Sequence, residues 1–236
     1  NLARMYLNMD MEEDAVKEYQ AIYEKSPENF DEWENYSKAL LLTKKNKKVV
    51  EIIQPAINED PDNAQFKVIL ATAYENLGDK ENAVEQYKTA LKLDSTLTDI
   101  QFNLAKLSDE LGREEDAIKY YEACLEAQPN NAEVYYNLAS IYQRKKDYDN
   151  SIATLTKLKE HENSDAKVLR EIGKNYYMSG DFNQSVNYYK EALKITPDNA
   201  QLYYYMALSY TLLKDYDLAT ESYKKSIELK DDPKVK

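Results

Sequence analysis

The sequence has 236 residues but only one cysteine, one histidine, four glycines and six prolines. The single cysteine, Cys124, excludes an internal disulfide bond and a cysteine-based zinc site. One histidine and one cysteine in different parts of the chain provide no nucleophile–base pair, and no glycine-rich phosphate loop is present. We therefore expect neither catalysis nor a bound cofactor. No apolar stretch approaches the roughly 18 residues needed to cross a bilayer, so a membrane-spanning helix is not expected.

Basic residues are also too few to favour a polyanionic partner. The formal net charge is −12, and residues 1–131 carry 15 Lys and Arg against 27 Asp and Glu, whereas residues 132–236 carry 16 of each sign. Nucleic-acid and anionic-membrane binding both depend on clustered basic side chains, so the charge argues against both. A basic run at residues 44–48 lies between two predicted helices and is interpreted as a solvated turn.

What the sequence does contain is a block of 34 residues that recurs without insertion or deletion. A small residue stands at the twentieth place of every block except one, which has Val49, and a bulky side chain follows four places later. A fixed long period indicates stacked copies of one supersecondary unit, none of which buries its apolar face alone. We therefore expect one domain over residues 1–236, a piece of a longer array, with these blocks: 1–29 (lacking its first five residues), 30–63, 64–97, 98–131, 132–165, 166–199 and 200–233.

Each block has the pattern of two helices. In residues 166–199 an apolar face at helical spacing is followed by Gly180-Asp181, then by a second apolar face, then by Pro197. Lys146 and Lys214 replace the glycine of this turn in two blocks. From this replacement we infer that the turn does not need a positive φ. The scarcity of glycine and proline elsewhere agrees with long, regular elements.

This pattern resembles the tetratricopeptide repeat, whose 34-residue signature is a series of Trp, Leu-Gly, Tyr, Ala, Phe, Ala and Pro. The second block begins the series with Trp33, and the last block matches it with Tyr203, Met206, Ala207, Tyr210, Ala219, Tyr223 and Ser226. The resemblance implies an all-α, right-handed superhelical solenoid of antiparallel helix-turn-helix repeats. It also implies that the first helices line a concave wall and that the protein binds other proteins, but it indicates no particular partner.

The middle of the array departs from the pattern. Gln101 and Ser108 stand at places where large apolar residues are expected, as Lys67 does one block earlier. We therefore expect this part to pack less tightly than the rest. Pro55 lies within the second helix of its block, where it removes a backbone donor and is expected to cause a kink.

Asparagine recurs at the sixth place of the blocks, on a face of the first helix that we expect to be unused for packing. The members are Asn1, Asn35, Asn103 and Asn137. An amide offers donors and an acceptor to an extended peptide backbone, and the pattern resembles the asparagine ladder with which some members of the family hold substrate backbone. Asn103 and Asn137 stand in adjacent blocks, and we predict that these two contact a peptide. A scaffold role for the asparagines is the alternative.

A basic strip follows on the same face. Lys167, Arg170 and Lys174 recur at spacings of three and four, so they share one side of a helix. Aromatic and further basic residues at equivalent places complete the predicted peptide-binding face: Phe102, Lys106, Tyr136, Arg144, Tyr177, Tyr204 and Tyr205. Aromatic and arginine side chains are common anchors of protein recognition. The strip suits an acidic or carboxylate-bearing segment, and an ordinary solvated face is the alternative.

The resemblance does not extend to the carboxylate clamp with which some members of the family bind chaperone C-termini. Asn137 and Lys167 occupy two matching places, but Phe102, Lys106 and Glu171 stand at the others. We predict a non-catalytic interaction module that binds a peptide segment of a protein partner in its concave groove. The alternatives are a structural scaffold that self-associates through the array ends, and the recruiting arm of an enzyme whose catalytic part is absent. The cellular compartment is left open.

Overall fold

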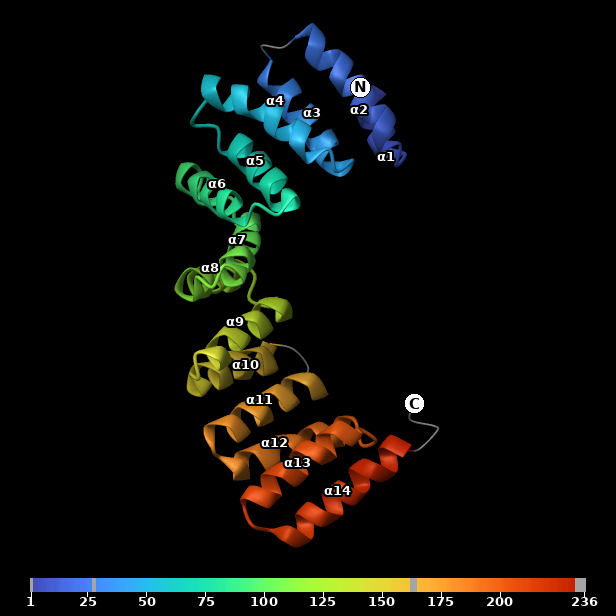
Figure 1. Cartoon of the computed structure of the whole chain (residues 1–236), viewed down its shortest axis with the longest axis vertical. Coiled ribbons are helices and arrows are strands. Elements are labelled where there is room, and N and C mark those ends of the chain that lie inside the picture. The colour runs from blue at the N-terminus through green and yellow to red at the C-terminus, as the bar shows by residue number, and fades with distance from the viewer. Residues whose placement is uncertain (1, 27–28, 162–164, 232–236) are drawn as a thin grey trace. The chain divides into compact units, whose positions relative to one another are not determined.

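The described residues are entirely helical apart from turns and short connections, as the sequence predicts. A computed structural model describes residues 2–26, 29–161 and 165–231, which form fourteen α-helices and no strand (Figure 1). Each block contains two of them. The helices are α1(Leu2–Asn8), α2(Glu12–Lys25), α3(Phe30–Leu42), α4(Asn46–Glu59), α5(Ala64–Leu77), α6(Lys80–Leu93), α7(Asp99–Glu110), α8(Glu114–Ala127), α9(Ala132–Arg144), α10(Tyr148–His161), α11(Ala166–Ser179), α12(Phe182–Ile195), α13(Ala200–Leu212) and α14(Tyr216–Asp231).

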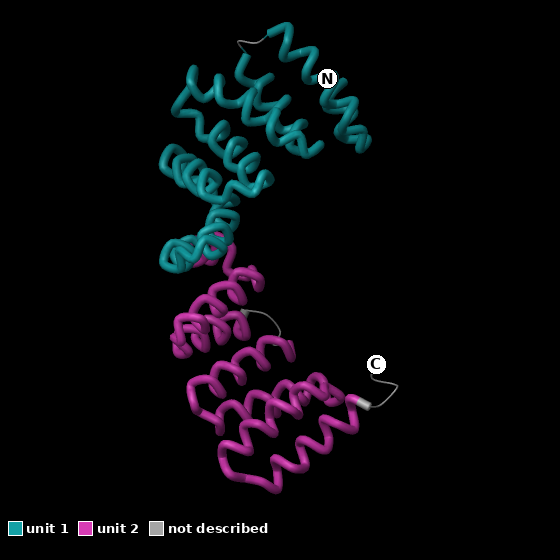
Figure 2. Tube along the Cα trace, in the orientation of Figure 1, with its two compact units in different colours: residues 1–120 teal, residues 121–236 magenta. Residues whose placement is uncertain are grey.

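The chain forms two compact units, residues 1–120 and residues 121–236 (Figure 2). In unit 1 every helix from α1 to α7 packs against the next, and in unit 2 every helix from α9 to α14 does so. First helices of consecutive blocks also contact each other directly, α3 with α5 and α11 with α13. This sequential packing of helix pairs confirms the predicted helical hairpins. The single continuous domain stays a prediction.

Small side chains allow the two helices of a block to pack closely. The residue at place 20 is buried in all seven blocks, and so is the small residue at place 8 of the facing helix. In block 5 these two places meet directly, because Ser151 Oγ donates a hydrogen bond to the Ala139 carbonyl at 3.0 Å. The bulky residue at place 24 is buried in six blocks, and Tyr223 is half-buried in the seventh. Within each block the core therefore combines small residues at places 8 and 20 with a bulky residue at place 24.

The turn between the two helices has a positive φ in all seven blocks, so the inference that it does not need one was wrong. The residues at this place are Asp10, Lys44, Gly78, Gly112, Lys146, Gly180 and Lys214, with φ between 56° and 92°. In six of these turns the next residue donates its N–H back into the helix, as Asp147 does to the Tyr142 carbonyl at 2.8 Å. This bond closes a Schellman turn, which requires the left-handed conformation. Lysine and aspartate adopt it here at a cost in backbone energy.

Helix starts explain why the fourth block is irregular. Asn63, Asn131 and Asn199 each precede a first helix and accept a hydrogen bond from its first turn, as Asp165 also does. Leu97 replaces the asparagine in block 4, and α7 begins only at Asp99 without a side-chain cap. The missing cap is a physical reason to expect weaker packing of this block, which stays a prediction.

Two buried oxygens in α7 are a second reason to expect weaker packing of block 4. Gln101 Oε1 and Ser108 Oγ have no hydrogen-bond partner within the described residues. A buried polar atom without a partner loses its hydration without compensation. Helix α4 continues through Pro55, whose side chain is exposed. The kink expected at this residue stays a prediction.

The turn geometry predicts that Lys146→Gly stabilises the protein. Lys146 has φ 58°, where glycine is free of the Cβ strain that lysine carries. We expect the free energy of unfolding in urea to rise by about 0.5–1 kcal/mol. Lys145→Gly is the matched control, because Lys145 has φ −71° and ordinary helical backbone. The free energy of unfolding of the control should fall by about 1 kcal/mol. Equal falls in both variants would contradict a strained left-handed backbone at Lys146.

Alanine substitution at place 8 is expected to change the stability of the protein in opposite directions in blocks 2 and 6. Ser37 is fully buried and its Oγ has no partner among the described residues, so Ser37→Ala should raise the free energy of unfolding by about 1 kcal/mol. A Cβ on Gly173 would meet Tyr189 Cε1 at 2.8 Å and Cδ1 at 2.9 Å. Gly173→Ala should therefore destabilise the protein through overpacking. Chemical denaturation measures both, and a shift of the same sign in the two variants would refute the packing argument.

Candidate functional site

The predicted site residues lie on first helices, and none of the twelve is fully buried. Three of them belong to unit 1 and nine to unit 2, so the two sets are described separately. Unit 1 carries Phe102, Asn103 and Lys106 on α7; unit 2 carries Tyr136, Asn137 and Arg144 on α9, Lys167, Arg170, Lys174 and Tyr177 on α11, and Tyr204 and Tyr205 on α13. Because α11 and α13 contact each other, their exposed side chains form one surface within unit 2.

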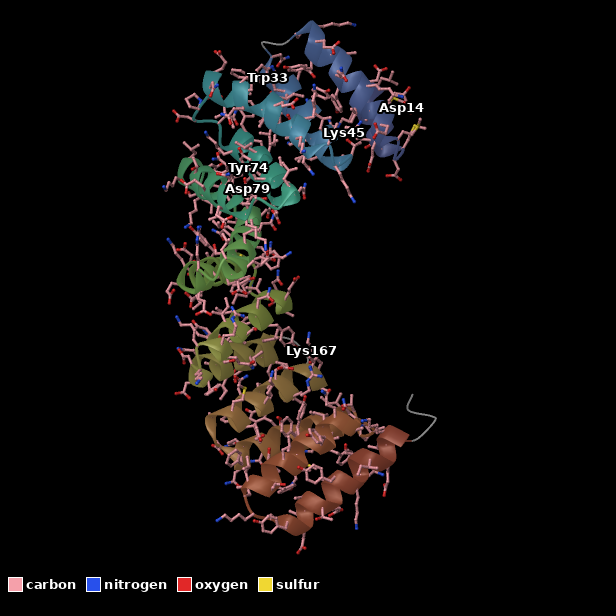
Figure 3. All side chains as sticks on the ribbon, in the orientation of Figure 1. Asp14, Trp33, Lys45, Tyr74, Asp79 and Lys167 are labelled. Carbon is pink, nitrogen blue, oxygen red and sulfur yellow. The ribbon has the colours of Figure 1, made fainter. Side chains whose placement is uncertain are left out.

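The basic strip borders a hollow between α9 and α11. The hollow has a volume of ≈ 230 Å³, and its polar lining comes from Ser140 and Gln143 on α9 and from Lys167, Glu171 and Lys174 on α11. The Nζ of Lys167, labelled in Figure 3, lies 3.9 Å from the centroid of the Tyr136 ring. This cation–π contact holds the ammonium group at the edge of the hollow. The sequence did not single out Ser140 or Gln143 as lining residues.

Glu171 is the carboxylate in the middle of the strip. Arg170 donates to Glu171 Oε1 through Nε at 3.1 Å and through Nη2 at 2.8 Å. Lys174 Nζ lies 3.9 Å from Glu171 Oε2, and the Glu171 side chain is 21% exposed. Two cations thus contact one carboxylate, and Lys167 on Tyr136 adds a third cation to the strip, which leaves a positive surface. The negative charge of Glu171 also repels an incoming carboxylate and offsets part of the attraction from the nearby cations.

The remaining predicted residues contribute mainly aromatic area and one further cation. Arg144 lies exposed at the end of α9, where its Nη1 is 3.5 Å from Ser140 Oγ. The Tyr177 ring packs edge-on against Phe182 of α12 at 5.7 Å between ring centroids. Tyr204 is 45% exposed and lies in edge-on contact with Tyr223 of α14. These rings are anchored on one side and open to solvent on the other.

Place 6 of the first helix is used for packing, contrary to the prediction. Ile69 at this place is only 2% exposed and shares an apolar cluster with Ile53 of the preceding block. Tyr205 at the same place stacks on Tyr189 with ring centroids 5.8 Å apart. The Tyr205–Tyr189 stack joins place 6 to place 24 of the block before. The premise that place 6 is unused for packing was therefore wrong in blocks 3 and 7.

The asparagine Asn103 has an equivalent contact. The Tyr87 hydroxyl donates to Glu75 Oε2 at 2.9 Å and lies 3.2 Å from Thr72 Oγ1, and the Asn103 side chain acts to lower the pKa of this hydroxyl. Burial raises the pKa of Tyr87 to about 12, so the hydroxyl stays protonated at neutral pH. The sequence held a signal for this contact: three of the asparagines at place 6 follow a block with tyrosine at place 24, in the pairs Tyr19–Asn35, Tyr87–Asn103 and Tyr121–Asn137. Asn1 lies outside the described residues.

The described ranges also bear on metal sites and on membrane-spanning helices. No three His, Cys, Asp or Glu side chains there are grouped to hold a metal ion. No helix of the described part is long and apolar enough to cross a membrane. Cys124 is a free, buried cysteine, and burial raises the pKa of its thiol to about 11. Cys124 is 7% exposed and packs as a small hydrophobic residue.

Three family models match the sequence. One described as TPR repeat matches residues 173–214, and two described as tetratricopeptide repeat match residues 110–170 and residues 64–97 and 200–233. No curated protein matches the chain significantly. Among solved structures, 388 chains match.

Three of these structures illustrate the range. The C-terminal part of a TPR repeat-containing protein from Cytophaga hutchinsonii is 16% identical with a TM-score of 0.79, over 99% of this chain and 96% of that one. MamA is 22% identical with a TM-score of 0.62, over 71% and 92%. YrrB, described as a TPR protein with an unusual peptide-binding site, is 19% identical with a TM-score of 0.60, over 79% and 96%. At these identities the likeness shows the fold alone.

The repeat register, the packing of consecutive helix pairs and the matches within residues 64–233 agree with one another: the chain belongs to the tetratricopeptide repeat family, whose domains are generally protein–protein interaction modules and typically non-catalytic.

Proposed function

We propose that this chain is a non-catalytic interaction module and that unit 2 holds an acidic peptide segment of a partner protein on α9, α11 and α13. The observation that carries the proposal is the hollow beside Lys167 and Lys174, where cations and tyrosines gather on a chain of net charge −12. Family membership supports the class of function. The peptide-binding site named for YrrB supports a peptide as the ligand, since the two chains share the fold.

The rings and the cations have different tasks in this proposal. Tyr136, Tyr177 and Tyr204 offer partly exposed rings that are already packed on one side, so little side-chain freedom is lost when a ligand covers them. Lys167 and Lys174 lie at the rim of the hollow and attract carboxylates before contact. The rings therefore supply the buried area, and the lysines supply selectivity for acidic residues.

Glu171 sets the strength of that selectivity. Its carboxylate is held by Arg170 and lies within 3.9 Å of Lys174, which are the groups that an acidic ligand would engage. A ligand carboxylate must share these cations with Glu171. The module should accordingly bind with moderate affinity and release its partner readily.

A charge series tests the acidic preference. A labelled peptide of eight alternating Glu and Gly residues is titrated against Lys167→Ala/Lys174→Ala, and we expect roughly tenfold weaker binding at low salt. Glu171→Gln should bind the same peptide a few-fold more tightly, because it removes the competing charge. Lys157→Ala/Lys194→Ala, on second helices of unit 2, is the matched control with the same charge change. Equal affinity in all variants, or equal binding of the Gln-for-Glu peptide, would exclude the strip as the site.

A second test distinguishes the role of Asn137 in binding from that of Asn103 in stability. An amide that bonds one tyrosine keeps further hydrogen-bonding capacity for a ligand, so we propose that Asn137 on α9 also contacts the peptide backbone. Asn137→Ala should weaken peptide binding by several-fold. Asn103→Ala should instead lower the free energy of unfolding by about 0.5–1 kcal/mol, because the buried Tyr87 hydroxyl loses the polar side chain of Asn103 from its surroundings. Binding isotherms and urea denaturation of both variants decide, and unchanged peptide affinity in Asn137→Ala would contradict the backbone contact.

Self-association is the second candidate function, and exposed apolar residues favour it. Met5 and Met9 are 57% and 62% exposed at α1, and Tyr216 and Ile227 are 63% and 61% exposed on α14. Exposed apolar surface of this kind is common at sites of association. Sedimentation over a range of protein concentrations distinguishes a self-associating scaffold from a monomeric peptide receptor. The role of recruiting arm for an enzyme stays an alternative.

A further inference from the structure

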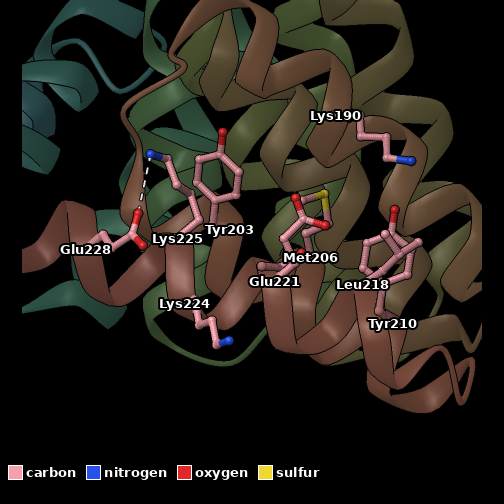
Figure 4. Close-up of a pocket in the computed structure, with 10 residues that line it drawn as sticks. Lys190, Tyr203, Met206, Tyr210, Leu218, Glu221, Lys224, Lys225 and Glu228 are labelled. Carbon is pink, nitrogen blue, oxygen red and sulfur yellow. Dashed lines mark ion pairs between the residues drawn. The ribbon is translucent and has the colours of Figure 1, made fainter.

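Unit 2 has two hollows on its second-helix side, away from the basic strip. One of ≈ 580 Å³ lies over α13, between α12 and α14 (Figure 4), and one of ≈ 450 Å³ lies over α9, between α8 and α10. Their floors are built from the same three places of the first helix: Tyr203, Met206 and Tyr210 in block 7, and Tyr135, Leu138 and Tyr142 in block 5. The hollows are therefore one repeated feature of the fold.

The residue at place 23 explains why these hollows are open. Blocks 5 and 7 have Thr154 and Ser222 at this place, and each lines its hollow with a short side chain. Block 6 has Tyr188 instead, and its ring stacks on Tyr176 with centroids 5.4 Å apart and an interplanar angle of 21°. Tyr176 stands at the place that Tyr210 and Tyr142 hold in the other two blocks. An aromatic ring thus fills in block 6 the space that the short residues leave in blocks 5 and 7.

We propose that the hollow of block 7 is a docking site for a partner protein segment that presents an aromatic side chain next to an acidic residue. Tyr188 on Tyr176 is the internal example of the aromatic half of this contact. In block 7 the incoming ring would lie above Ser222, against Tyr210 and the Met206 thioether, which both favour aromatic neighbours. Leu218 forms the outer apolar wall and is 38% exposed.

The charges at the rim select the residue beside the ring. The block 7 hollow is bordered by Lys190, Lys224 and Lys225 against Glu221 and Glu228. Only Lys225 has a carboxylate partner, Glu228 at 3.6 Å; Lys190 and Lys224 have none among the described residues. Lys190 Nζ lies 5.5 Å from the centroid of the Tyr210 ring, so its charge and that of Lys224 are placed for an acidic residue beside an incoming ring.

The block 5 hollow has the opposite balance at its rim. Glu122 and Glu126 face a single cation, Lys157. The same shape with reversed charge should reject an acidic segment, so block 5 is a built-in comparison for block 7.

The test uses the full chain with ¹³C-methyl-labelled methionine and a short peptide, acetyl-Glu-Asp-Tyr-Asp-Glu-amide. Met206 lines the hollow and reports an incoming ring through its ring-current shift, while Met178 on α11 is an exposed reference in the same molecule. We expect a saturable shift of the Met206 methyl resonance. The peptide with leucine for tyrosine, and the peptide with lysine for its acidic residues, should each bind at least about tenfold more weakly.

Two variants locate the contact. Ser222→Tyr supplies the ring internally, as block 6 does, and should abolish the peptide-induced shift while raising the unfolding midpoint; Thr154→Tyr fills the block 5 hollow and should leave peptide binding unchanged. Leu218→Glu, at a partly exposed position, places repelling charge at the wall and should weaken binding even if Ser222→Tyr folds poorly. The proposal is overturned if Met206 shows no saturable shift, or if Leu218→Glu and Thr154→Tyr have equal effects. A Met206 shift that grows with protein concentration alone would identify the ring donor as a second copy of this chain and overturn the assignment to a separate partner.

Discussion

Close approach of a small residue and a bulky one across each helix pair is the constraint on which the rest of the structure depends. The contact between Gly173 and Tyr189 is its tightest form, because the ring lies where a methyl group would otherwise be. Elsewhere alanine or serine stands at place 8 and is buried. Small residues at this place let the two helices of a block pack closely, and the outward faces of the first helices carry cations and aromatic rings.

The contacts between successive blocks restrict that freedom more than the helix pairs do. Tyr205 at place 6 stacks on Tyr189 at place 24 of the block before, Ile69 is buried in one apolar cluster with Ile53, and Asn103 influences the pKa of Tyr87. A residue on the ligand-facing side of a first helix is consequently part of an inter-block joint as well. The surface best suited to vary is the strip around Lys167 and Lys174, where side chains rest on Tyr136 and Glu171 rather than on the core.

Much of this architecture could be predicted from sequence, because a 34-residue period fixes both the number of hairpins and the buried places within them. The turn conformation could not, since Lys146 and Lys214 adopt a left-handed backbone that their residue type disfavours and that only the hydrogen bonds of the closed turn impose. The role of place 6 was misjudged because a single helix was considered without the tyrosine that covers it from the neighbouring block. The members of the basic strip were found from their spacing. Their pairing was not, because the Lys167–Tyr136 contact joins two blocks and depends on side-chain direction.

The joint between place 24 and place 6 has a consequence for how such an array gains or loses modules during evolution. Excision of residues 98–131 would set Tyr87 opposite Asn137, a combination that already occurs in the chain. Excision of residues 64–97 would set Ile53 opposite Asn103 and leave an amide against an aliphatic surface. Deletion at the first junction would thus keep this residue pairing, and deletion at the second would not. The pairing therefore favours some whole-block deletions over others.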